Sequence, residues 1–510
     1  MTSPLSDTAV IDTLGADLRS AGYTTDGVGD LLGADAGAAF SRGQWWSALR
    51  ITERATAERQ RLAVLVRLFL LGAEESRDRV AVAVPTSGVD ALIANGVVEP
   101  TPSGAVRAAL DIRPHGDGRR DFLVVSDLDA ALRPGPVHDD HVLGIGGASV
   151  TLAHAVVRTH VGRALDLGTG CGVQALHLDA HCDAIVATDT NERALALAAA
   201  TARLNGMSWD LRCGSLFEPV DGERFDLIVS NPPFVVGTGA LHYMYRDSGM
   251  AGDSLSQNLI EAVGEHLEPG GTAQIMANWI VRHGEERDAW RDRVGGWLAT
   301  TGLHAWAVQR EFADPISYVS LWTSDAGELP EEAARRGGQW LDWFDGEGIA
   351  GVGMGMITLR APRRGERRRP DHVLEEITGA DEALTGPEVE AFFARREYLH
   401  DTDDAHLLAA KLSTAPVILE EQSLPGPQGW QTVGAAVRRP GGPAAVIGVD
   451  EVSRALLAGC RGEVPLGALI DLLAAHHGVD SDALAVAALP VVREAIGRGI
   501  LYQAGQPTSI

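Results

Sequence analysis

Cysteine and long apolar runs are scarce in this sequence, and each shortage excludes a class of protein. The four cysteines are scattered and form no Cys-x-x-Cys pair, which argues for a reducing cytoplasm and against a zinc site. No apolar run reaches the roughly 18–20 residues that cross a bilayer. The first residues also lack the basic segment and apolar stretch of a signal peptide. We therefore expect a cytoplasmic protein that holds no metal and is not bound to a membrane.

Positive charge is also in short supply. The formal net charge is −26, and the only lysine is Lys411. A chain this acidic is not expected to grip nucleic acid broadly and without regard to sequence. The local exception is residues 360–369, which hold six arginines. This run is predicted to be a solvated linker, and the alternative is a loop that contacts phosphate.

The length of 510 residues exceeds what one hydrophobic core supports and predicts about three domains. Residues 1–130 show helical patterns followed by two extended segments around a His-Gly-Asp-Gly turn. Residues 375–510 end in two helical patterns and a short strand. Both ends suggest small α+β, winged-helix-like domains, which in other proteins bind DNA, dimerise or hold substrate. Between them we expect a main domain at 131–360 and an arginine-rich linker at 361–374.

The main domain alternates short apolar strands with helices, which predicts a parallel sheet covered on both faces. The strands are expected at 164–168, 184–189, 210–213, 225–230 and 272–277, with closing strands at 306–308 and 318–322 and one appended strand at 354–359.

Residues 231–234 read Asn-Pro-Pro-Phe and directly follow the predicted strand 225–230. Two prolines lack N–H groups and have a fixed φ, so the strand must end here in a stiff loop. We expect this loop to free the Asn231 amide and the carbonyls of Ser230, Asn231 and Pro232, with the Phe234 ring beside them. These groups suit a flat ligand that carries an NH₂. The alternative is a strand-ending turn with a core phenylalanine.

Residues 166–172 read Asp-Leu-Gly-Thr-Gly-Cys-Gly, between a predicted strand and a helix. Glycines at such a point let the backbone turn sharply and approach a ligand closely. Asp189 ends the next strand, 23 positions after Asp166 (189 − 166), where a carboxylate can accept from both hydroxyls of a ribose. The spacing GxGxG, instead of GxGxxG, favours a nucleoside cofactor without a pyrophosphate over NAD.

Together these motifs resemble those of class I S-adenosylmethionine-dependent methyltransferases. They are most similar to the amino-directed subfamily, which includes release-factor glutamine methyltransferases and the adenine-N6 and guanine-N2 methyltransferases of RNA or DNA. The resemblance covers about 142–322 and includes the stretch 245–252. It implies S-adenosyl-L-methionine as cofactor and a Rossmann-like α/β domain. The implied sheet is mixed, mostly parallel and seven-stranded, with helices on both faces and a smaller winged-helix-like domain on either side.

The resemblance also implies roles for single residues. Those implied to bind the cofactor are Asp166, Gly168, Thr169, Gly170, Gly172, Asp189, Thr190, Ser215, Leu216 and Asn231. Asn231, Pro232 and Phe234 are implied to be catalytic. Asn231 and the Pro232 carbonyl would accept the two N–H bonds of the target nitrogen, and Phe234 would stack on its planar group.

One residue departs from the family pattern. The family usually has an acidic residue after the third strand, which accepts from the adenine amino group, and this chain has Ser215 in a Gly-Ser-Leu-Phe stretch. A hydroxyl accepts more weakly than a carboxylate, so weaker cofactor affinity is predicted.

The sequence leaves the methyl acceptor open. A protein glutamine, as in release factors, agrees with the acidic composition, whereas an RNA base agrees with the arginine run and the winged-helix-like flanks. A small molecule or modified peptide is a further alternative. A non-catalytic scaffold that binds the cofactor is also conceivable, but the intact residues 231–234 argue against it.

Overall fold

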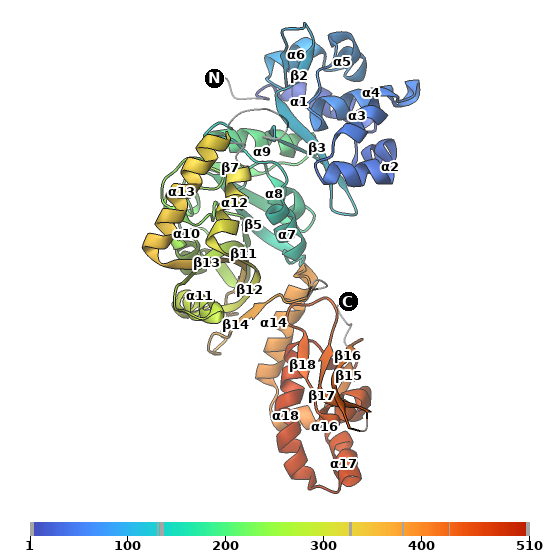
Figure 1. Cartoon of the computed structure of the whole chain (residues 1–510), viewed down its shortest axis with the longest axis vertical. Coiled ribbons are helices and arrows are strands. Elements are labelled where there is room, and N and C mark those ends of the chain that lie inside the picture. Colours follow the sequence, from blue (N-terminus) through green and yellow to red (C-terminus); the bar gives the residue numbers. More distant parts are fainter. Residues whose placement is uncertain are drawn as a thin grey trace. The chain divides into compact units, whose positions relative to one another are not determined.

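The computed structural model describes residues 5–129, 132, 137–325, 329–379, 382–427 and 429–505. They fall into two compact units (Figure 1). The first unit comprises Met1–Ala153 and Thr159–Leu374, and the second comprises His154–Arg158 and Glu375–Ile510. The start of the chain and the predicted domain boundary at 130/131 lie outside the described residues, and the predicted division into domains stays a prediction.

The N-terminal part of the first unit consists of short helices and two antiparallel hairpins. Its helices are α1 (Thr8–Ser20), α2 (Thr25–Ser41), α3 (Trp46–Glu53), α4 (Gln60–Leu65), α5 (Arg77–Ala83) and α6 (Val89–Ala94). Its strands are β1 (Val98–Pro100), β2 (Val106–Ala108), β3 (Leu110–Gly116) and β4 (Asp121–Asp127), paired β1–β2 and β3–β4. Arg19 of α1 donates to the Leu204 carbonyl at 2.8 Å, and Asn205 bonds both backbone polar groups of Leu123. These bonds join the N-terminal part directly to the central sheet domain.

The central domain is built on one large sheet. Its strands are β5 (Val161–Leu167), β6 (Cys182–Asp189), β7 (Asp210–Cys213), β8 (Phe225–Ser230), β11 (Leu267–Arg282), β12 (His304–Ala313), β13 (Ile349–Arg360) and β14 (His372–Glu376). Their order across the sheet is β14-β12-β13-β11-β8-β5-β6-β7. The neighbours from β11 to β7 pair in parallel, and β13 runs antiparallel to both β11 and β12. The two short strands β9 (Gly237–Thr238) and β10 (Ala251–Gly252) pair with each other and so close the loop that connects β9 to β10.

Helices cover both faces of this sheet. They are α7 (Gly147–Ala155), α8 (Val173–Leu178), α9 (Glu192–Leu204), α10 (Ser254–Ala262), α11 (Trp290–Ala299), α12 (Pro315–Asp325) and α13 (Pro330–Glu347). Side chains alternate along β11, so Trp279 packs with the core under α10 and α11, whereas Ile280 packs with the core under α12 and α13. The prediction of a mixed, mostly parallel sheet covered on both faces is therefore confirmed.

Two details of the sequence prediction were wrong. The sheet has eight strands and not seven, because residues 372–376 at the end of the arginine-rich stretch add β14 beside β12. Residues 318–322, predicted to be a closing strand, lie in helix α12. Their aromatic and β-branched residues suit a strand, but Tyr318 and Val319 pack into the core with Trp340 and Phe344 of α13. Tertiary packing overrides the local preference here.

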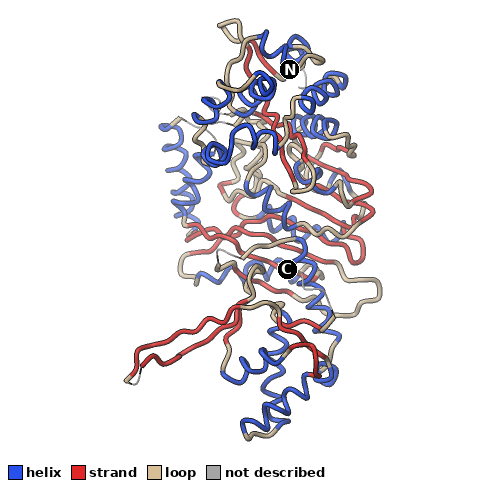
Figure 2. Tube along the Cα trace, turned by 90° about the vertical axis from the view of Figure 1, so that its right-hand side faces the viewer, coloured by secondary structure: helices blue, strands red, loops and turns tan. Residues whose placement is uncertain are grey.

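The second unit has two three-stranded sheets and five helices in its described residues. The helices are α14 (Gly386–Asp401), α15 (Asp404–Ala409), α16 (Glu451–Gly459), α17 (Leu466–His477) and α18 (Ser481–Gly497). The sheets are β19-β15-β20 (Arg461–Pro465, Lys411–Thr414, Leu501–Gln503) and β16-β17-β18 (Ile418–Gly426, Gly429–Arg438, Val446–Gly448). The hairpin of β16 and β17 extends as a long ribbon (Figure 2). The winged-helix likeness of this unit stays a prediction.

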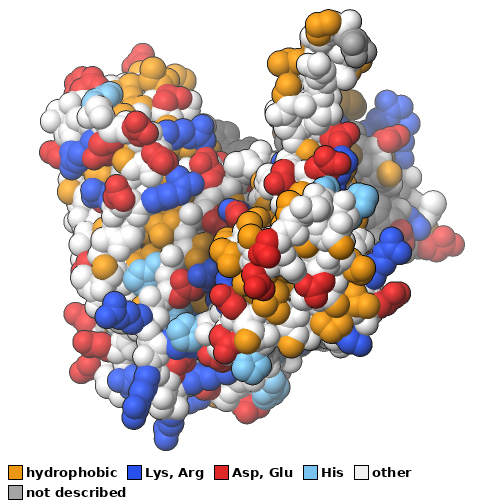
Figure 3. Space-filling model, turned by 90° about the horizontal axis from the view of Figure 1, so that it is seen from below, with side chains coloured by type: hydrophobic (Ala, Val, Ile, Leu, Met, Phe, Trp, Pro, Cys, Tyr) orange, Lys and Arg blue, Asp and Glu red, His pale blue; other side chains and the backbone are white. Residues whose placement is uncertain are grey.

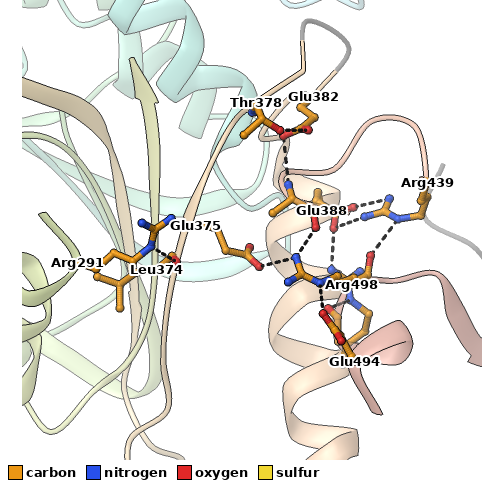
Figure 4. A network of polar contacts seen from close by, with 12 residues as sticks. Arg291, Leu374, Glu375, Thr378, Glu382, Glu388, Arg439, Glu494 and Arg498 are labelled. Atoms are coloured by element: carbon orange, nitrogen blue, oxygen red, sulfur yellow. Dashed lines mark hydrogen bonds and ion pairs between the residues drawn. The ribbon is translucent and has the colours of Figure 1, made fainter. Parts of the chain in front are cut away.

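A buried ion-pair network ties α14 to the end of α18 (Figure 4). Glu388 of α14 accepts from Arg395 at 2.7 Å and from two nitrogens of Arg439 at 2.8 and 3.1 Å. Arg395 and Arg439 in turn donate to the carbonyls of Gly497 and Arg498. One carboxylate thus fixes two guanidinium groups, and these groups satisfy carbonyls at the C-terminus of α18.

Among the described residues, no helix combines the length and the hydropathy that a bilayer crossing requires.

Candidate active site

A cavity of about 780 Å³ opens at the carboxyl ends of the parallel strands. It is lined by the loops after β5, β6, β7 and β8, together with parts of residues 141–149 and 241–250. In open α/β sheets this edge is where ligands bind, because the loops after successive strands converge there. The cavity therefore brings together the motifs that the sequence presents separately.

The glycine loop after β5 forms one wall of this cavity. Gly168, Gly170 and Gly172 all have positive φ (75°, 55° and 88°), a conformation that favours glycine. Gly168, Thr169 and Gly170 line the cavity, whereas Gly172 does not. A Cβ at Gly172 would lie 2.6 Å from the Trp209 ring, so this glycine is needed for packing beneath the loop.

Asp166 also lies outside the cavity lining and is fully buried. Its Oδ2 accepts from the Thr169 hydroxyl at 2.6 Å and from the Ala175 N–H at 3.1 Å. Burial raises the pKa of Asp166 to about 7, although these two hydrogen bonds act in the opposite direction. The contacts show a carboxylate that holds the glycine loop against the first turn of α8.

Asp189, at the end of β6, lies in the cavity wall with Thr190. Its two oxygens accept from the Gly170 and Asn191 N–H groups, each at 2.9 Å. Burial raises the pKa of Asp189, and these backbone bonds oppose the shift. Each oxygen has more than one lone pair, so the carboxylate can accept further hydrogen bonds from hydroxyls in the cavity.

Ser215 and Leu216 reach the cavity from the turn after β7. Leu216 has a φ of 49°, an uncommon conformation for a branched side chain. Ser215 is exposed, so its hydroxyl is available where the family usually has a carboxylate.

Asn231, Pro232 and Phe234 line the cavity beside these cofactor-side loops. The Asn231 Nδ2 donates to the Ser149 hydroxyl at 3.2 Å, which orients the amide. Its Oδ1 is buried and has no hydrogen-bond partner among the described residues. A buried carbonyl oxygen without a partner costs about 1–3 kcal/mol, so this atom is a ready acceptor for a ligand N–H.

The carbonyl of Pro232 was expected to be free, but it already accepts a hydrogen bond within the loop. It accepts from the Phe234 N–H at 2.8 Å, a tight turn between residues two apart. Because Pro233 has no N–H to offer, the Phe234 N–H is the next donor along the chain. The expectation of a free Pro232 carbonyl was therefore wrong, although its second lone pair leaves room for one more hydrogen bond.

Tyr318 holds the far end of the Asn-Pro-Pro-Phe loop. Its hydroxyl accepts from the Val236 N–H at 2.9 Å and from the Asn278 amide at 2.8 Å. The Val236 carbonyl in turn accepts from the Trp340 indole at 3.1 Å. Both backbone groups of Val236 are thus fixed by buried side chains from α12 and α13.

The structure adds Trp322 to the site, outside every sequence motif, and places Arg246 of the stretch 245–252 beside it. Trp322 lies edge-on to Phe234 with ring centroids 6.2 Å apart. Arg246 is buried, donates to the Trp322 carbonyl at 2.6 Å and lies over the Tyr243 ring. The stretch 245–252 already stood out by its resemblance, but Trp322 carries no local signal because α12 brings it to the site from outside every motif.

Comparison with known proteins agrees with this site. Residues 144–286 match the family model described as the methyltransferase small domain, and residues 20–109 and 390–503 match two domains of unknown function. A release factor glutamine methyltransferase of Xylella fastidiosa is 34% identical over 209 residues, which are 38% of this chain and 70% of that protein. A ribosomal RNA small subunit methyltransferase C of Klebsiella pneumoniae is 34% identical over 129 residues, which are 25% of this chain and 34% of that protein.

Among solved structures, a T. thermophilus 16S rRNA N2 G1207 methyltransferase in complex with AdoMet and guanosine is similar at a TM-score of 0.28 and 14% identity. The match covers 61% of this chain and 71% of that one. A score this low adds nothing to the comparison of sequences. The Xylella relative, by contrast, is matched over more than two thirds of its length, and the chain therefore belongs with it to the N-directed family of class I S-adenosylmethionine-dependent methyltransferases.

Proposed function

We propose that this protein methylates a planar nitrogen, either the amide of a protein glutamine or the exocyclic amine of an RNA base. The observation that carries this proposal is the buried Oδ1 of Asn231, which lies at the cavity without a partner among the described residues. Such an acceptor suits an NH₂ group, whose hydrogen atoms lie in the plane of the amide or ring.

The cofactor of the family, S-adenosylmethionine, supplies a methyl group on a sulfonium. On this proposal Asp189 accepts from its ribose hydroxyls, the glycine loop lets the backbone approach it, and Ser215 lies by its adenine. The fit agrees with the geometry, since Asp189, Gly168 and Gly170 all line the same cavity as Asn231.

The remaining residues position the acceptor. Asn231 Oδ1 and the Pro232 carbonyl take one N–H each, and Phe234 stacks on the planar group. This alignment turns the nitrogen lone pair out of conjugation and toward the methyl group. No strong base is needed, because the nitrogen becomes acidic once it carries positive charge.

Two acceptors are consistent with the known relatives, which methylate release factors or ribosomal RNA according to their names. A small molecule or modified peptide is the remaining alternative. Methyl transfer from labelled S-adenosylmethionine to a cell lysate separates them. If protease digests the labelled product, the acceptor is a protein. If RNase digests it, the acceptor is RNA. A labelled product that survives both enzymes is a small molecule.

The variant Asn231→Ala tests the chemistry itself. We expect turnover to fall by about 100-fold or more, as when one aligned polar contact to a reacting group is lost, while calorimetry shows S-adenosylmethionine still bound. Asn258→Ala, an exposed asparagine of α10, is the matched control and should keep full turnover. Near-normal activity of Asn231→Ala would contradict the proposal.

A further inference from the structure

Two neighbouring indoles are exposed at the start of helix α3, in the N-terminal part of the first unit. Trp45 is 50% exposed and Trp46 is 65% exposed. By contrast, Trp279, Trp290 and Trp306 of the same unit are fully buried in its core. Two adjacent tryptophans left in water suggest a surface that a partner covers.

Three arginines lie close to these indoles in the chain. Trp46, Arg50 and Arg54 follow one another at intervals of four residues, so they lie along one side of α3 and its C-terminal end, about 6 Å apart. Arg42 precedes the indoles in the chain and is exposed like the other two arginines. We call Arg42, Trp45, Trp46, Arg50 and Arg54 the α3 face.

The positive charge of the α3 face is not neutralised by acidic side chains of the same stretch. In the described part of the chain, the three arginines have no hydrogen bond or ion pair that involves their side chains. The one acidic residue of the same stretch, Glu53, lies 3.4 Å from Arg67. Three free guanidinium groups beside two indoles therefore form a local basic site on a chain whose net charge of −26 opposes nucleic-acid binding over the rest of its surface.

The other candidate surfaces lack this combination. Trp430, at the tip of the β16–β17 ribbon, is 76% exposed, but its strand neighbours are glutamine, threonine and valine. In the arginine-rich stretch, Arg368 and His304 both contact Glu366, and no tryptophan is present. On the face drawn in Figure 3, basic and acidic side chains are intermixed and form no large area of one sign.

We propose that the α3 face binds single-stranded RNA. The arginines supply contacts to phosphate, and the indoles supply faces on which unpaired bases stack. A single strand offers both groups in repetition, whereas a duplex keeps its bases stacked inside. Sequence preference is expected to be small, because stacking on an indole suits every base. The proposal adds a partner to the proposed function and does not depend on which nitrogen is methylated.

Binding of a fluorescent single-stranded RNA of mixed sequence to the full chain, measured by anisotropy at low salt without cofactor, tests this proposal. We expect Trp45→Ala/Trp46→Ala to weaken binding by about tenfold or more. Removal of all three arginines should lower the steepness of log K against log salt by about two, since each phosphate contact on a single strand contributes about 0.7.

Matched variants separate the α3 face from other surfaces. Trp430→Ala removes an indole that is even more exposed than Trp45 and Trp46. Arg364→Ala/Arg367→Ala removes two exposed arginines. Both variants should bind the RNA as the unchanged protein does. RNA binding is measured without cofactor and separately from turnover, so a protein that binds RNA through the α3 face but transfers no methyl group contradicts only the methyl-transfer proposal, and a protein that transfers methyl but binds no RNA there contradicts only this one. The inference is overturned if the unchanged protein binds no RNA, if the control variants lose as much affinity as the α3 variants, or if only an acidic protein binds there.

Discussion

The two units of the chain bury a carboxylate in opposite ways. In the first unit, Asp166 is held by neutral donors, a hydroxyl and a backbone N–H, and its second oxygen has no hydrogen bond among the described residues. In the second unit, Glu388 is held by two guanidinium groups that bond both of its oxygens. One oxygen of Asp166 is thus left without a hydrogen bond in the described residues, whereas both oxygens of Glu388 are bonded.

This difference distinguishes the first unit, whose cavity can bind a ligand, from the Glu388 network of the second unit, which stabilises the fold. Asp166 lies behind the cavity wall, but the Asn231 Oδ1 lies at the cavity and also has no partner in the described residues, so the first unit keeps an acceptor that a ligand can satisfy. The Glu388 network has guanidinium groups on both carboxylate oxygens and spans α14, the turn near Arg439 and the end of α18. Loss of one residue of the Glu388 network should therefore destabilise the second unit. Loss of one polar residue at the cavity should instead change ligand binding by the first unit.

Glu388→Ala is the strongest test of this comparison. Removing it leaves two buried guanidinium groups without their carboxylate, which typically costs about 3–5 kcal/mol. We expect hydrogen exchange in α14 and α18 to accelerate accordingly. Trp430 is the only tryptophan after residue 375, so unfolding of the first unit, followed by tryptophan fluorescence, should be unchanged.

The control for this variant is Glu420→Ala, which removes a half-exposed carboxylate that pairs with Arg438 at 2.9 Å. A surface pair of this kind is worth about 0–1 kcal/mol. Equal effects of the two variants would show that the buried network has no special part in stability.

The carboxylate in the first unit should make stability depend on pH. Because burial raises the pKa of Asp166 from 3.8 to about 7, the folded chain binds this proton more tightly than the unfolded chain. Its contribution is therefore fully present below about pH 4, is lost as the pH rises to about 7, and is constant above that. The loss amounts to roughly 4 kcal/mol at most, at 1.4 kcal/mol for each pKa unit.

Urea unfolding followed by tryptophan fluorescence in a Trp430→Phe background measures this dependence for the first unit alone. Asp166→Asn should flatten the profile between pH 4 and 7, whereas Asp221→Asn, at an exposed position, should leave it unchanged. An unaltered slope in Asp166→Asn would show that other groups set the pH dependence.

The smallest effect is expected at Ser215. A carboxylate accepts a hydrogen bond more strongly than a hydroxyl by about 1 kcal/mol, so Ser215→Asp should tighten S-adenosylmethionine binding about fivefold in calorimetry. Ser215→Ala, which removes the acceptor, should weaken it. An unchanged or weaker affinity in Ser215→Asp would mean that this turn does not read the adenine amino group.

Much of the site was predictable because its parts are local. Glycines with positive φ, a carboxylate at a strand end and two consecutive prolines each impose a backbone geometry on their neighbours. The alternation of strands and helices then places the ends of β5, β6 and β8 at one edge of a sheet. Asp189 and Asn231 could thus be expected at one cavity although 42 residues (231 − 189) separate them.

Helix α12 could not be predicted in this way. Its composition suits a strand as well as a helix, and the choice depends on packing against α13. The contacts of Tyr318 with Val236 and of Arg246 with Trp322 join segments about 80 residues apart. Such pairs leave no periodic pattern in the sequence, because each partner is chosen by the folded surface that it meets.

The sequence by itself determined the family, the cofactor loop and the Asn-Pro-Pro-Phe loop, since steric limits on glycine and proline act within a few residues. Only the tertiary structure decided that Asp166 and Gly172 lie behind the cavity wall, that the Pro232 carbonyl is already engaged by the Phe234 N–H, and that the Asn231 Oδ1 is not engaged among the described residues. The reason is physical: which polar atoms stay free depends on every donor that the fold brings near, and those donors come from the whole unit.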